Sequence, residues 1–237
     1  MDVVVNAATS VDGKLSTRRR EQLRISGPED FDRVDRHRAA ADAIAVGVGT
    51  VFADDPNLGV KEERRRVTRL QNGRPGHPAR VVVDSRARTP TDAALFDGDA
   101  EVYVLTTGGA PRERRDALRE AGASVVVADG ADDGARADEE NKRVNLPEAF
   151  DALSADGIDR LMVEGGGELI YSLFDAGLVD ELSVYVGSFV VGGRDAPTLA
   201  DGEGFVDAFP RLDLTDVDRL DDGVVLSYTV DGVTDRD

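Results

Sequence analysis

Residues 159–174 read DRLMVEGGGELIYSLF, and this stretch decides the fold class. The apolar run at 161–163 is typical of a strand buried in a parallel sheet. Three glycines follow at 165–167, and the apolar residues after them recur at helical spacing up to Gly177, which can end the helix. A strand, a glycine turn and a helix start together offer an anion bare backbone N–H groups and the positive end of a helix. The alternative is a tight turn that binds nothing.

Apolar runs and helical patterns alternate along most of the rest of the chain. We predict strands over 3–8, 43–48, 80–84, 102–106 and 124–128, helices over 28–41, 111–121 and 146–155, and one helical turn over 51–56. Such alternation indicates βαβ units and a largely parallel sheet. The last two predicted strands, 181–186 and 224–230, have no clear helix between them, so they can pair antiparallel at one edge. The sequence predicts an α/β fold with a mostly parallel, mixed central sheet.

We expect one domain over residues 1–237, because no linker or repeat separates two halves. Residues 61–78 are polar and rich in Arg, Gly and Pro, which favours an exposed connection. Residues 128–143 are acidic and small, and we expect a second exposed loop there. Residues 232–237 are expected to form a tail.

The charge of the chain limits its partners. The formal net charge is −18, from 47 acidic and 29 basic residues, and the lysines are Lys14, Lys61 and Lys142. This acid excess favours a halophilic protein, which stays soluble in high salt where surface charges are screened, over an ordinary acidic protein. No basic face stands against the negative background, so we expect no nucleic-acid partner.

Missing residue types exclude several kinds of site. The chain has no cysteine, which excludes disulfides, thiolate nucleophiles and cysteine-based zinc sites. Its two histidines cannot build a multi-histidine metal site, so we expect no metal. Residues 1–6 lack the basic start and long apolar run of a signal peptide, and no segment approaches the ~20 apolar residues of a membrane helix. We therefore expect a soluble, cytoplasmic protein.

Three predicted strands end in a similar polar or glycine-rich sequence. Gly47-Val48-Gly49-Thr50 ends one, Asp84-Ser85 ends a second, and Glu164 with its three glycines ends a third. Because the carboxyl ends of parallel strands line one rim of a sheet, these groups can converge on one crevice. Glycine backbone approaches phosphates closely and hydroxyls donate to phosphate oxygens, so the pattern favours a phosphorylated ligand such as a dinucleotide. The usual Gly-x-Gly-x-x-Gly fingerprint and the Walker lysine are both absent.

A set of short motifs extends this pattern over nearly the whole chain. In order they are Val11–Lys14, Val46–Val51 running into Asp54–Leu58, Val82–Ser85, Glu164–Gly167, Val179–Glu181 and Ala196–Thr198. The set resembles the pyrimidine reductases of riboflavin biosynthesis, and among them most of all the stand-alone archaeal type. These enzymes have a dihydrofolate-reductase-like fold, which implies a three-layer α/β/α sandwich. Their bacterial counterparts carry a zinc deaminase domain, which a chain without cysteine cannot form.

The resemblance implies NADPH-dependent reduction of the ribosyl group of 2,5-diamino-6-ribosylamino-4(3H)-pyrimidinone 5′-phosphate to the ribityl form. The ribosylamine opens to an imine at C1′ and the nicotinamide supplies the hydride, so the protein must mainly align the reactants and hold both phosphates. Relatives form homodimers, and we expect one here. Two alternatives remain: another NADPH-dependent reductase of this fold, such as a dihydrofolate reductase, and a non-catalytic nucleotide-binding protein.

The resemblance also implies which residues contact NADPH. They are Thr50, Asp54, Ser85, Gly165, Gly166, Gly167 and Glu168, with the glycines and the helix start at the pyrophosphate. Arg86 and Arg88 are candidates for a contact with the 2′-phosphate.

On the substrate side, the resemblance implies Arg38 for the phosphate, Leu58 for the pocket wall and Glu164 for the amino and ring N–H donors of the pyrimidine. Lys61 is expected near the position where the bacterial relatives place an arginine as a further phosphate contact. Asp12 is either a turn-forming residue or a group that assists imine formation or proton transfer. No general acid or base is assigned.

Overall fold

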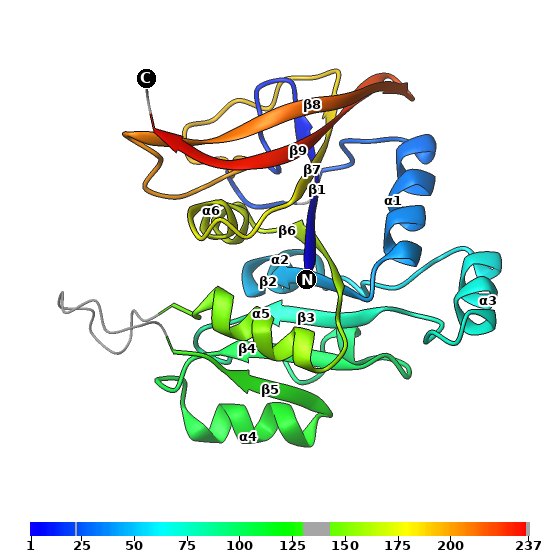
Figure 1. Ribbon diagram of the computed structural model, residues 1–237, viewed down its shortest axis with the longest axis vertical. Helices are drawn as coiled ribbons and strands as arrows, with labels where there is room; N and C mark the ends of the chain where they lie inside the picture. The colour runs from blue at the N-terminus through cyan, green and yellow to red at the C-terminus, as the bar shows by residue number, and fades with distance from the viewer. Residues whose placement is uncertain (22, 130–142, 236–237) are drawn as a thin grey trace. The chain divides into compact units, whose positions relative to one another are not determined.

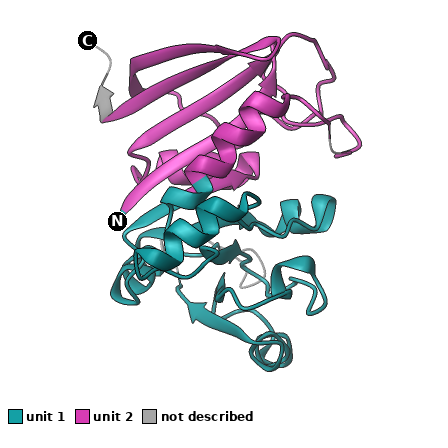
Figure 2. Cartoon of the chain, turned by 90° about the vertical axis from the view of Figure 1, so that its right-hand side faces the viewer, with its two compact units in different colours: residues 1, 38–161 teal, residues 2–37, 162–237 magenta. Residues whose placement is uncertain are grey.

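The computed structural model of the chain describes residues 1–21, 23–129 and 143–235 (Figure 1). The chain divides into two compact units (Figure 2). Unit 1 contains residue 1 and residues 38–161, and unit 2 contains residues 2–37 and 162–237. Two elements run from one unit into the other along the chain: α1 (Pro28–Ala40) and β6 (Arg160–Gly165).

Unit 1 is built around parallel strands. They are β2 (Ala43–Gly47), β3 (Ala79–Val83), β4 (Val102–Thr106) and β5 (Ala123–Val127), in the order β5-β4-β3-β2. Each neighbouring pair is parallel, with Val46 opposite Val82 in the pair of β2 and β3. Runs of Val, Ala, Ile and Leu leave β2, β3 and β4 almost fully buried, which is typical of parallel strands covered on both faces.

The helices of unit 1 follow these strands. They are α2 (Val48–Asp54), α3 (Glu63–Gln71), the 3₁₀ helix η1 (Ala94–Phe96), α4 (Arg112–Glu120) and α5 (Leu146–Ala155). The helices predicted over 111–121 and 146–155 are confirmed as α4 and α5. Asn145 starts α5 because its side chain accepts from the N–H of Glu148 at 3.4 Å. No helix in the described part of the chain is long and apolar enough to cross a membrane.

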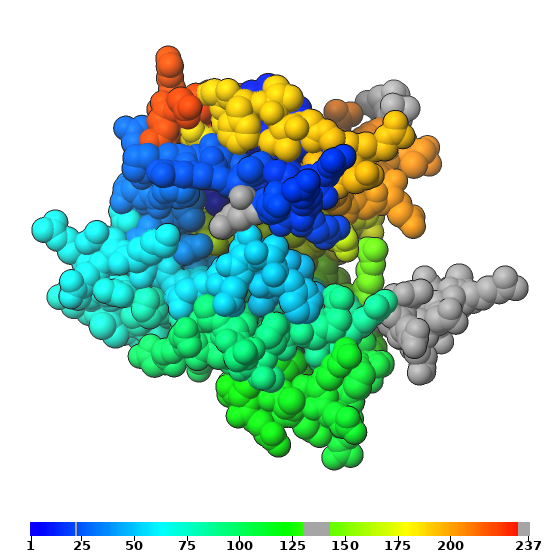
Figure 3. All heavy atoms as spheres, turned by 180° about the vertical axis from the view of Figure 1, so that it is seen from behind, coloured from blue at the N-terminus to red at the C-terminus, as the bar shows by residue number. Residues whose placement is uncertain are grey.

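The exposed connection predicted for residues 61–78 is wrong in part, because it contains α3. Glu62 caps the start of this helix, because its side chain accepts from the N–H of Arg64 at 3.3 Å. Most of α3 is exposed (Figure 3, cyan atoms), so its sequence lacks the apolar face that predicts a helix. Its buried residue is a charged one, Arg69. Nearly all of the second predicted loop, 128–143, lies outside the described residues.

Unit 2 contains a mixed set of strands. Its elements besides α1 and β6 are β1 (Asp2–Ser10), α6 (Gly167–Asp175), β7 (Glu181–Gly187), β8 (Ala208–Leu220) and β9 (Gly223–Asp235). Four of the strands follow the order β1-β7-β9-β8. The pair β1–β7 is parallel, whereas β7–β9 and β8–β9 are antiparallel. The antiparallel pairing predicted between 181–186 and 224–230 is confirmed.

The sequence does not predict β8, the last strand in this order. Its pairing with β9 shifts register between Pro210 and Leu212 and again between Leu214 and Asp216. These shifts break the two-residue period by which a strand is recognised in a sequence. The tail predicted over 232–237 is also wrong in part, because β9 continues to Asp235.

The buried face of α1 is charged rather than apolar. Arg33 donates to a carboxylate oxygen of Asp30 at 2.8 Å, one turn away. It also donates to Ser183 Oγ at 2.7 Å and to Asn6 Oδ1 at 2.9 Å, on β7 and β1. A charge can be buried here because it meets an opposite charge and further hydrogen-bond acceptors. The aromatic side chain of the helix, Phe31, is 45% exposed.

Candidate active site

The loop after α2 combines buried and strained residues. It runs over residues 55–61, and we name it the substrate loop because the sequence predicts substrate contacts at Leu58 and Lys61. Asp55 has a φ of 39° and Leu58 a φ of 55°, in the left-handed region that residues other than glycine rarely adopt. Leu58 is 1% exposed, whereas Lys61 lies at the surface. Strain of this kind persists only where neighbouring groups enforce it, and Ala94 N–H donates to Asp55 Oδ1 at 2.8 Å.

Two side chains hold the second half of the substrate loop by its backbone. Arg38 Nη1 donates to the carbonyl oxygen of Gly59 at 3.0 Å. The N–H of Val60 donates to His77 Nδ1 at 3.2 Å. Both bonds lie directly after Leu58 in the chain, where they fix its backbone. The structure therefore brings Arg38 to the loop that carries Leu58 and Lys61, and it adds His77, which no sequence motif marks.

The end of α1 that carries Arg38 is held by arginines of unit 1. Arg69, which is 3% exposed, donates from Nη1 to the carbonyl oxygens of Ala39 at 2.9 Å and Ala41 at 2.7 Å. Arg74 donates to the same Ala41 oxygen at 2.6 Å. These bonds satisfy carbonyls that a helix end leaves without helical partners, and they place positive charge at the negative end of the helix dipole. Burial and the neighbouring Arg74 lower the pKa of Arg69 to about 10, so it stays charged at neutral pH.

The predicted cofactor residues Thr50 and Asp54 lie on α2. This helix starts at Val48, directly after β2 and earlier than the predicted turn over 51–56. Thr50 is half-buried, and Asp54 is the last residue of the helix. The side chain of Asp54 reaches solvent, but the surrounding chain excludes enough water to raise its pKa.

The predicted cofactor residue Ser85 follows β3 beside a buried carboxylate. Ser85 Oγ accepts from the N–H of Val144 at 3.3 Å, and a hydroxyl that accepts one hydrogen bond can also donate one. Asp84 is fully buried and accepts from Thr89 N at 2.6 Å and Thr89 Oγ1 at 2.8 Å. It also forms an ion pair with Arg88 Nε at 3.8 Å. These interactions shape the turn after β3 and hold Arg88 beside it.

A hollow of ≈ 320 Å³ opens at this turn. It is lined by Ala87, Arg88, Thr89, Thr91, Arg114, Ala117 and Leu118. Arg114 belongs to α4, and its Nη1 donates to the carbonyl oxygen of Arg86 at 3.5 Å. Two guanidinium groups and the hydroxyl of Thr91 suit the hollow to a phosphate group. The sequence does not predict a site role for Arg114. It lies 28 positions from Arg86, and its helix has the charge pattern of a solvent-exposed face.

The glycine turn, residues 165–167, lies between β6 and α6 in unit 2. Gly166 is the N-cap of α6, with a φ of 96° and no side-chain cap. Gly167 has no room for a side chain, because a Cβ would overlap the backbone oxygen of Thr198 and lie 3.0 Å from Asp201 Oδ2. The N–H of Asp201 donates to the carbonyl oxygen of Gly167 at 3.0 Å. The strand, turn and helix predicted for this stretch are confirmed.

Two glutamates flank the glycine turn. Glu164 is half-buried near the end of β6, and Glu168 is exposed in the first turn of α6. The buried face of α6 is apolar, and its residues are Leu169, Ile170, Tyr171, Leu173 and Phe174, with Gly167. This face fixes the helix while its first turn presents backbone N–H groups at the positive end of the helix dipole, which suits an anion.

Asp12 holds another loop of unit 2. It accepts from Ser10 Oγ at 2.6 Å, Val191 N at 3.0 Å and Gly192 N at 2.7 Å. The hydrogen bond from Ser10 is the largest cause of a pKa lowered to about 2, and those from Val191 and Gly192 add to it. A carboxyl group with this pKa is ionised at neutral pH and accepts all three hydrogen bonds. These bonds give Asp12 the turn-forming role that the sequence allows.

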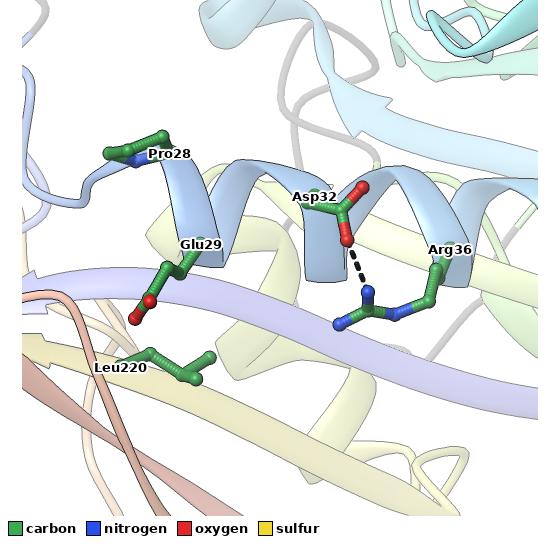
Figure 4. A pocket seen from close by; sticks show the side chains of 5 residues that line it. All are labelled: Pro28, Glu29, Asp32, Arg36 and Leu220. Carbon is green, nitrogen blue, oxygen red and sulfur yellow. Dashed lines mark hydrogen bonds and ion pairs between the residues drawn. The ribbon is translucent and has the colours of Figure 1, made fainter.

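A hollow of ≈ 440 Å³ lies along the first turns of α1 (Figure 4). It is lined by Pro28, Glu29, Asp32, Arg36 and Leu220, and Asp32 and Arg36 form an ion pair along α1. None of the residues predicted for the site lines this hollow.

A family model described as the RibD C-terminal domain matches residues 2–226. The chain belongs to the RibD C-terminal domain family. Two archaeal relatives within it are each named 2,5-diamino-6-ribosylamino-4(3H)-pyrimidinone 5′-phosphate reductase. The relative from Archaeoglobus fulgidus is 41% identical over 225 residues, which are 95% of this chain and 96% of that protein. The relative from Methanothermobacter thermautotrophicus is 42% identical over 233 residues, 97% of this chain and 98% of that protein.

Solved structures show that this RibD C-terminal domain shares its fold with proteins of low sequence identity. A pyrimidine reductase-like protein from Corynebacterium diphtheriae has a TM-score of 0.78 at 23% identity, over 97% of this chain and 91% of that chain. RibD from Acinetobacter baumannii has a TM-score of 0.74 at 22% identity, over 97% of this chain and 58% of that chain. Together with the strand pairing in each unit, this likeness confirms the predicted α/β class with mostly parallel, mixed strands.

Proposed function

We propose that this chain is an NADPH-dependent reductase that converts the ribosyl group of 2,5-diamino-6-ribosylamino-4(3H)-pyrimidinone 5′-phosphate to the ribityl form. The observation that carries the proposal is the identity of 41% and 42%, over 95% and 97% of this chain, to two archaeal proteins named for that reaction. The family match extends over residues 2–226 and so through both units, which supports a single reductase domain.

Arg38 and Lys61 are the proposed contacts to the substrate phosphate. Arg38 is fixed at the end of α1 and by its bond to the carbonyl oxygen of Gly59, and the fork of donors on a guanidinium suits a phosphate. Lys61, exposed at the end of the substrate loop, adds a second cation as a mobile point charge. Leu58 forms the proposed apolar wall, and its burial keeps that wall in place.

Glu164 is the proposed contact to the pyrimidine. Glu164 offers two acceptor oxygens to its amino and ring N–H donors, and partial burial strengthens such bonds because water competes less. The glycine turn and the first turn of α6, with Glu168, supply the proposed contacts to the pyrophosphate of the cofactor. When bound, the nicotinamide supplies the hydride that reduces C1′.

Thr50, Asp54 and Ser85 are further proposed contacts to the cofactor. We propose that the 2′-phosphate of NADPH binds in the hollow beside Ser85. The support is the pair of guanidinium groups of Arg88 and Arg114 among its lining residues.

We further propose a cytoplasmic homodimer adapted to high salt. On β8, Leu212, Leu214 and Val217 are 37%, 55% and 53% exposed, and apolar surface on an edge strand is typical of a contact between chains. The net charge of −18 supports solubility in high salt.

The test follows the oxidation of NADPH by the purified chain in high salt, with the diamino ribosylamino pyrimidinone phosphate as substrate. The deaminated pyrimidine and dihydrofolate serve as competing substrates, and NADH replaces NADPH in a parallel series. We expect turnover with the diamino substrate and NADPH. Glu164→Gln and Arg38→Ala should lower kcat/KM by roughly ten- to a hundredfold, because each removes a charge-assisted hydrogen bond.

Matched controls are Glu120→Gln and Arg112→Ala, two exposed positions of α4 that line neither the substrate loop nor the glycine turn. Both should leave kcat/KM unchanged. Binding of NADPH without reduction of any of the three substrates would overturn the proposed reaction. Reduction of dihydrofolate alone would assign the chain to a different reductase activity.

A further inference from the structure

His77 contacts the substrate loop directly after Leu58, the residue whose backbone is strained. The N–H of Val60 donates to His77 Nδ1 at 3.2 Å. The imidazole also lies against Gly59, where a Cβ would be 3.0 Å from Nδ1 and 3.3 Å from Cε1. Leu58, with its φ of 55°, comes directly before these two residues. His77 therefore both holds the loop by a hydrogen bond and limits its movement by contact.

The hydrogen bond to Val60 requires a neutral imidazole. A backbone N–H can only donate, so His77 Nδ1 must carry a lone pair, and the ring proton lies on Nε2. On protonation both ring nitrogens become donors. Two donors then face each other at 3.2 Å, and the bond that held the loop is lost.

Charged groups on several elements surround His77. Arg66 and Arg69 of α3 and Arg80 of β3 oppose a further positive charge, and Asp99, ahead of β4, acts in the other direction. Burial is the largest cause of a lowered pKa at His77, and the arginines add to it. The imidazole is therefore neutral at neutral pH, and the bond to Val60 is lost only in acid.

The other group that holds this half of the loop does not titrate in the same range. Arg38 donates to the carbonyl oxygen of Gly59 at 3.0 Å, and a guanidinium remains charged through neutral and acidic pH. Protonation of His77 thus removes one of the side-chain bonds beside Leu58 and leaves that of Arg38. A left-handed leucine is stable only while its surroundings enforce it, so the remaining bond holds it less firmly.

We propose that His77 is a positioning residue for substrate binding, which keeps the substrate loop in its strained conformation and releases it on protonation. The inference rests on the proposed function, because the substrate contacts of Leu58 and Lys61 belong to that proposal. The expected effect is on KM, with kcat unchanged, since His77 acts on the loop and not on the reacting atoms.

The experiment compares the wild-type chain with His77→Asn and His77→Leu from about pH 5 to about pH 8, the range in which histidine changes charge. Asparagine places an acceptor oxygen near the position of Nδ1 and does not titrate, whereas leucine has no acceptor. His37→Asn, at the chain's other histidine, is the matched control. The substrate phosphate also titrates in this range, and comparison with His77→Asn at each pH removes that shared effect.

We expect the KM of the wild type, relative to that of His77→Asn, to rise about five- to tenfold between the two ends of this range, with parallel kcat values. His77→Leu should show the raised KM at every pH, and His37→Asn should follow the wild type. Hydrogen exchange of residues 57–61, measured without substrate, should accelerate in acid in the wild type relative to His77→Asn. A KM ratio and an exchange ratio that both stay constant with pH overturn the inference.

The experiment distinguishes a failure of the proposed function from a failure of the inference about His77. If the wild type reduces none of the substrate at any pH, the proposed function is wrong, while the exchange measurement still decides whether His77 holds the loop. If the wild type turns over and the ratios stay constant, the inference about His77 alone is wrong. Should His77→Leu not fold, the comparison of the wild type with His77→Asn decides by itself.

Discussion

The glycine turn of unit 2 and the substrate loop of unit 1 both contain residues with a positive φ, but they are stabilised in different ways. Gly166 has a φ of 96°, and Asp55 and Leu58 have φ values of 39° and 55°. Glycine adopts such values without a steric cost, whereas another residue loses of the order of 1–3 kcal/mol that its neighbours must offset. In the substrate loop those neighbours are Arg38, His77 and the N–H of Ala94.

The difference determines how each segment responds to change. The glycine turn depends on the absence of side chains, so it is intolerant of substitution but carries no titratable group of its own. The substrate loop depends on bonds from other elements, so it can be loosened by substitution at a distance or by protonation of His77. A binding segment that side chains of other elements hold can respond to pH, whereas a glycine turn cannot.

The largest effect is expected from Gly167→Ala. The new Cβ would overlap the backbone oxygen of Thr198, and backbone cannot move aside as a flexible side chain can. Insertion of a methyl group at a packed site of this kind costs about 3 kcal/mol of unfolding free energy. Urea unfolding measures this loss, and NADPH affinity should fall with it because the first turn of α6 must shift.

The matched control is Gly49→Ala in α2, where no atom lies within 4 Å of the added Cβ. Alanine is favoured over glycine inside a helix by about 1 kcal/mol, so this variant should be as stable as the wild type or slightly more stable. Equal stability of the two alanine variants would show that the contact with Thr198 does not constrain the glycine turn.

The contrast between the two segments also explains what the sequence can predict. Three consecutive glycines after an apolar run are a local signal, and β6, the turn and α6 follow from it. The bonds that shape the substrate loop span 21, 17 and 39 positions, from Arg38 to Gly59, Val60 to His77 and Asp55 to Ala94. No periodicity marks such partners, so the sequence predicts the loop's Leu58 and Lys61 but not the histidine that holds them.

Exposure explains the elements that the sequence misses. The bounds of β4 and α5 agree with their predictions because each has a clear apolar pattern and a buried face. The faces of α3 and β8 are mostly exposed, and α3 buries a guanidinium, Arg69, where the pattern requires an apolar residue. Apolar periodicity in a sequence indicates a buried apolar face. Hydrogen bonds hold α3 and β8 instead.

A smaller effect is expected at Asp55. Two variants of this residue show whether its hydrogen bond and its left-handed backbone, or its charge, hold the substrate loop. Asp55→Ala removes the acceptor for Ala94 N–H and places alanine in the left-handed region, at a cost of about 1–2 kcal/mol. Asp55→Asn keeps an acceptor oxygen and a residue that tolerates this region, so it should stay within about 0.5 kcal/mol of the wild type. Urea unfolding of both variants measures the difference. Equal losses in the two would mean that the charge of Asp55, and not its geometry, holds the loop.

The smallest effect is expected at Asp12, which holds a third loop by its side chain. We expect the hold of Asp12 on this loop to be the same in neutral and in mildly acidic solution. Asp12 holds Val191 and Gly192, and its pKa falls from 3.8 to about 2 in the folded chain. A lowered carboxyl pKa stabilises the fold above the unfolded value of 3.8, and this contribution is lost as the pH falls through about 2. The stability difference between the wild type and Asp12→Asn should therefore be the same at about pH 7 and about pH 5, as urea midpoints would show.

Over the same pH interval, the stability difference between the wild type and His77→Asn should change. The reason is that a lowered histidine pKa makes the fold less stable as the pH falls below 6.5. A difference for Asp12→Asn that also changed would mean that Asp12 titrates near neutral pH, and that loops held by side chains in this protein share a sensitivity to mild acid.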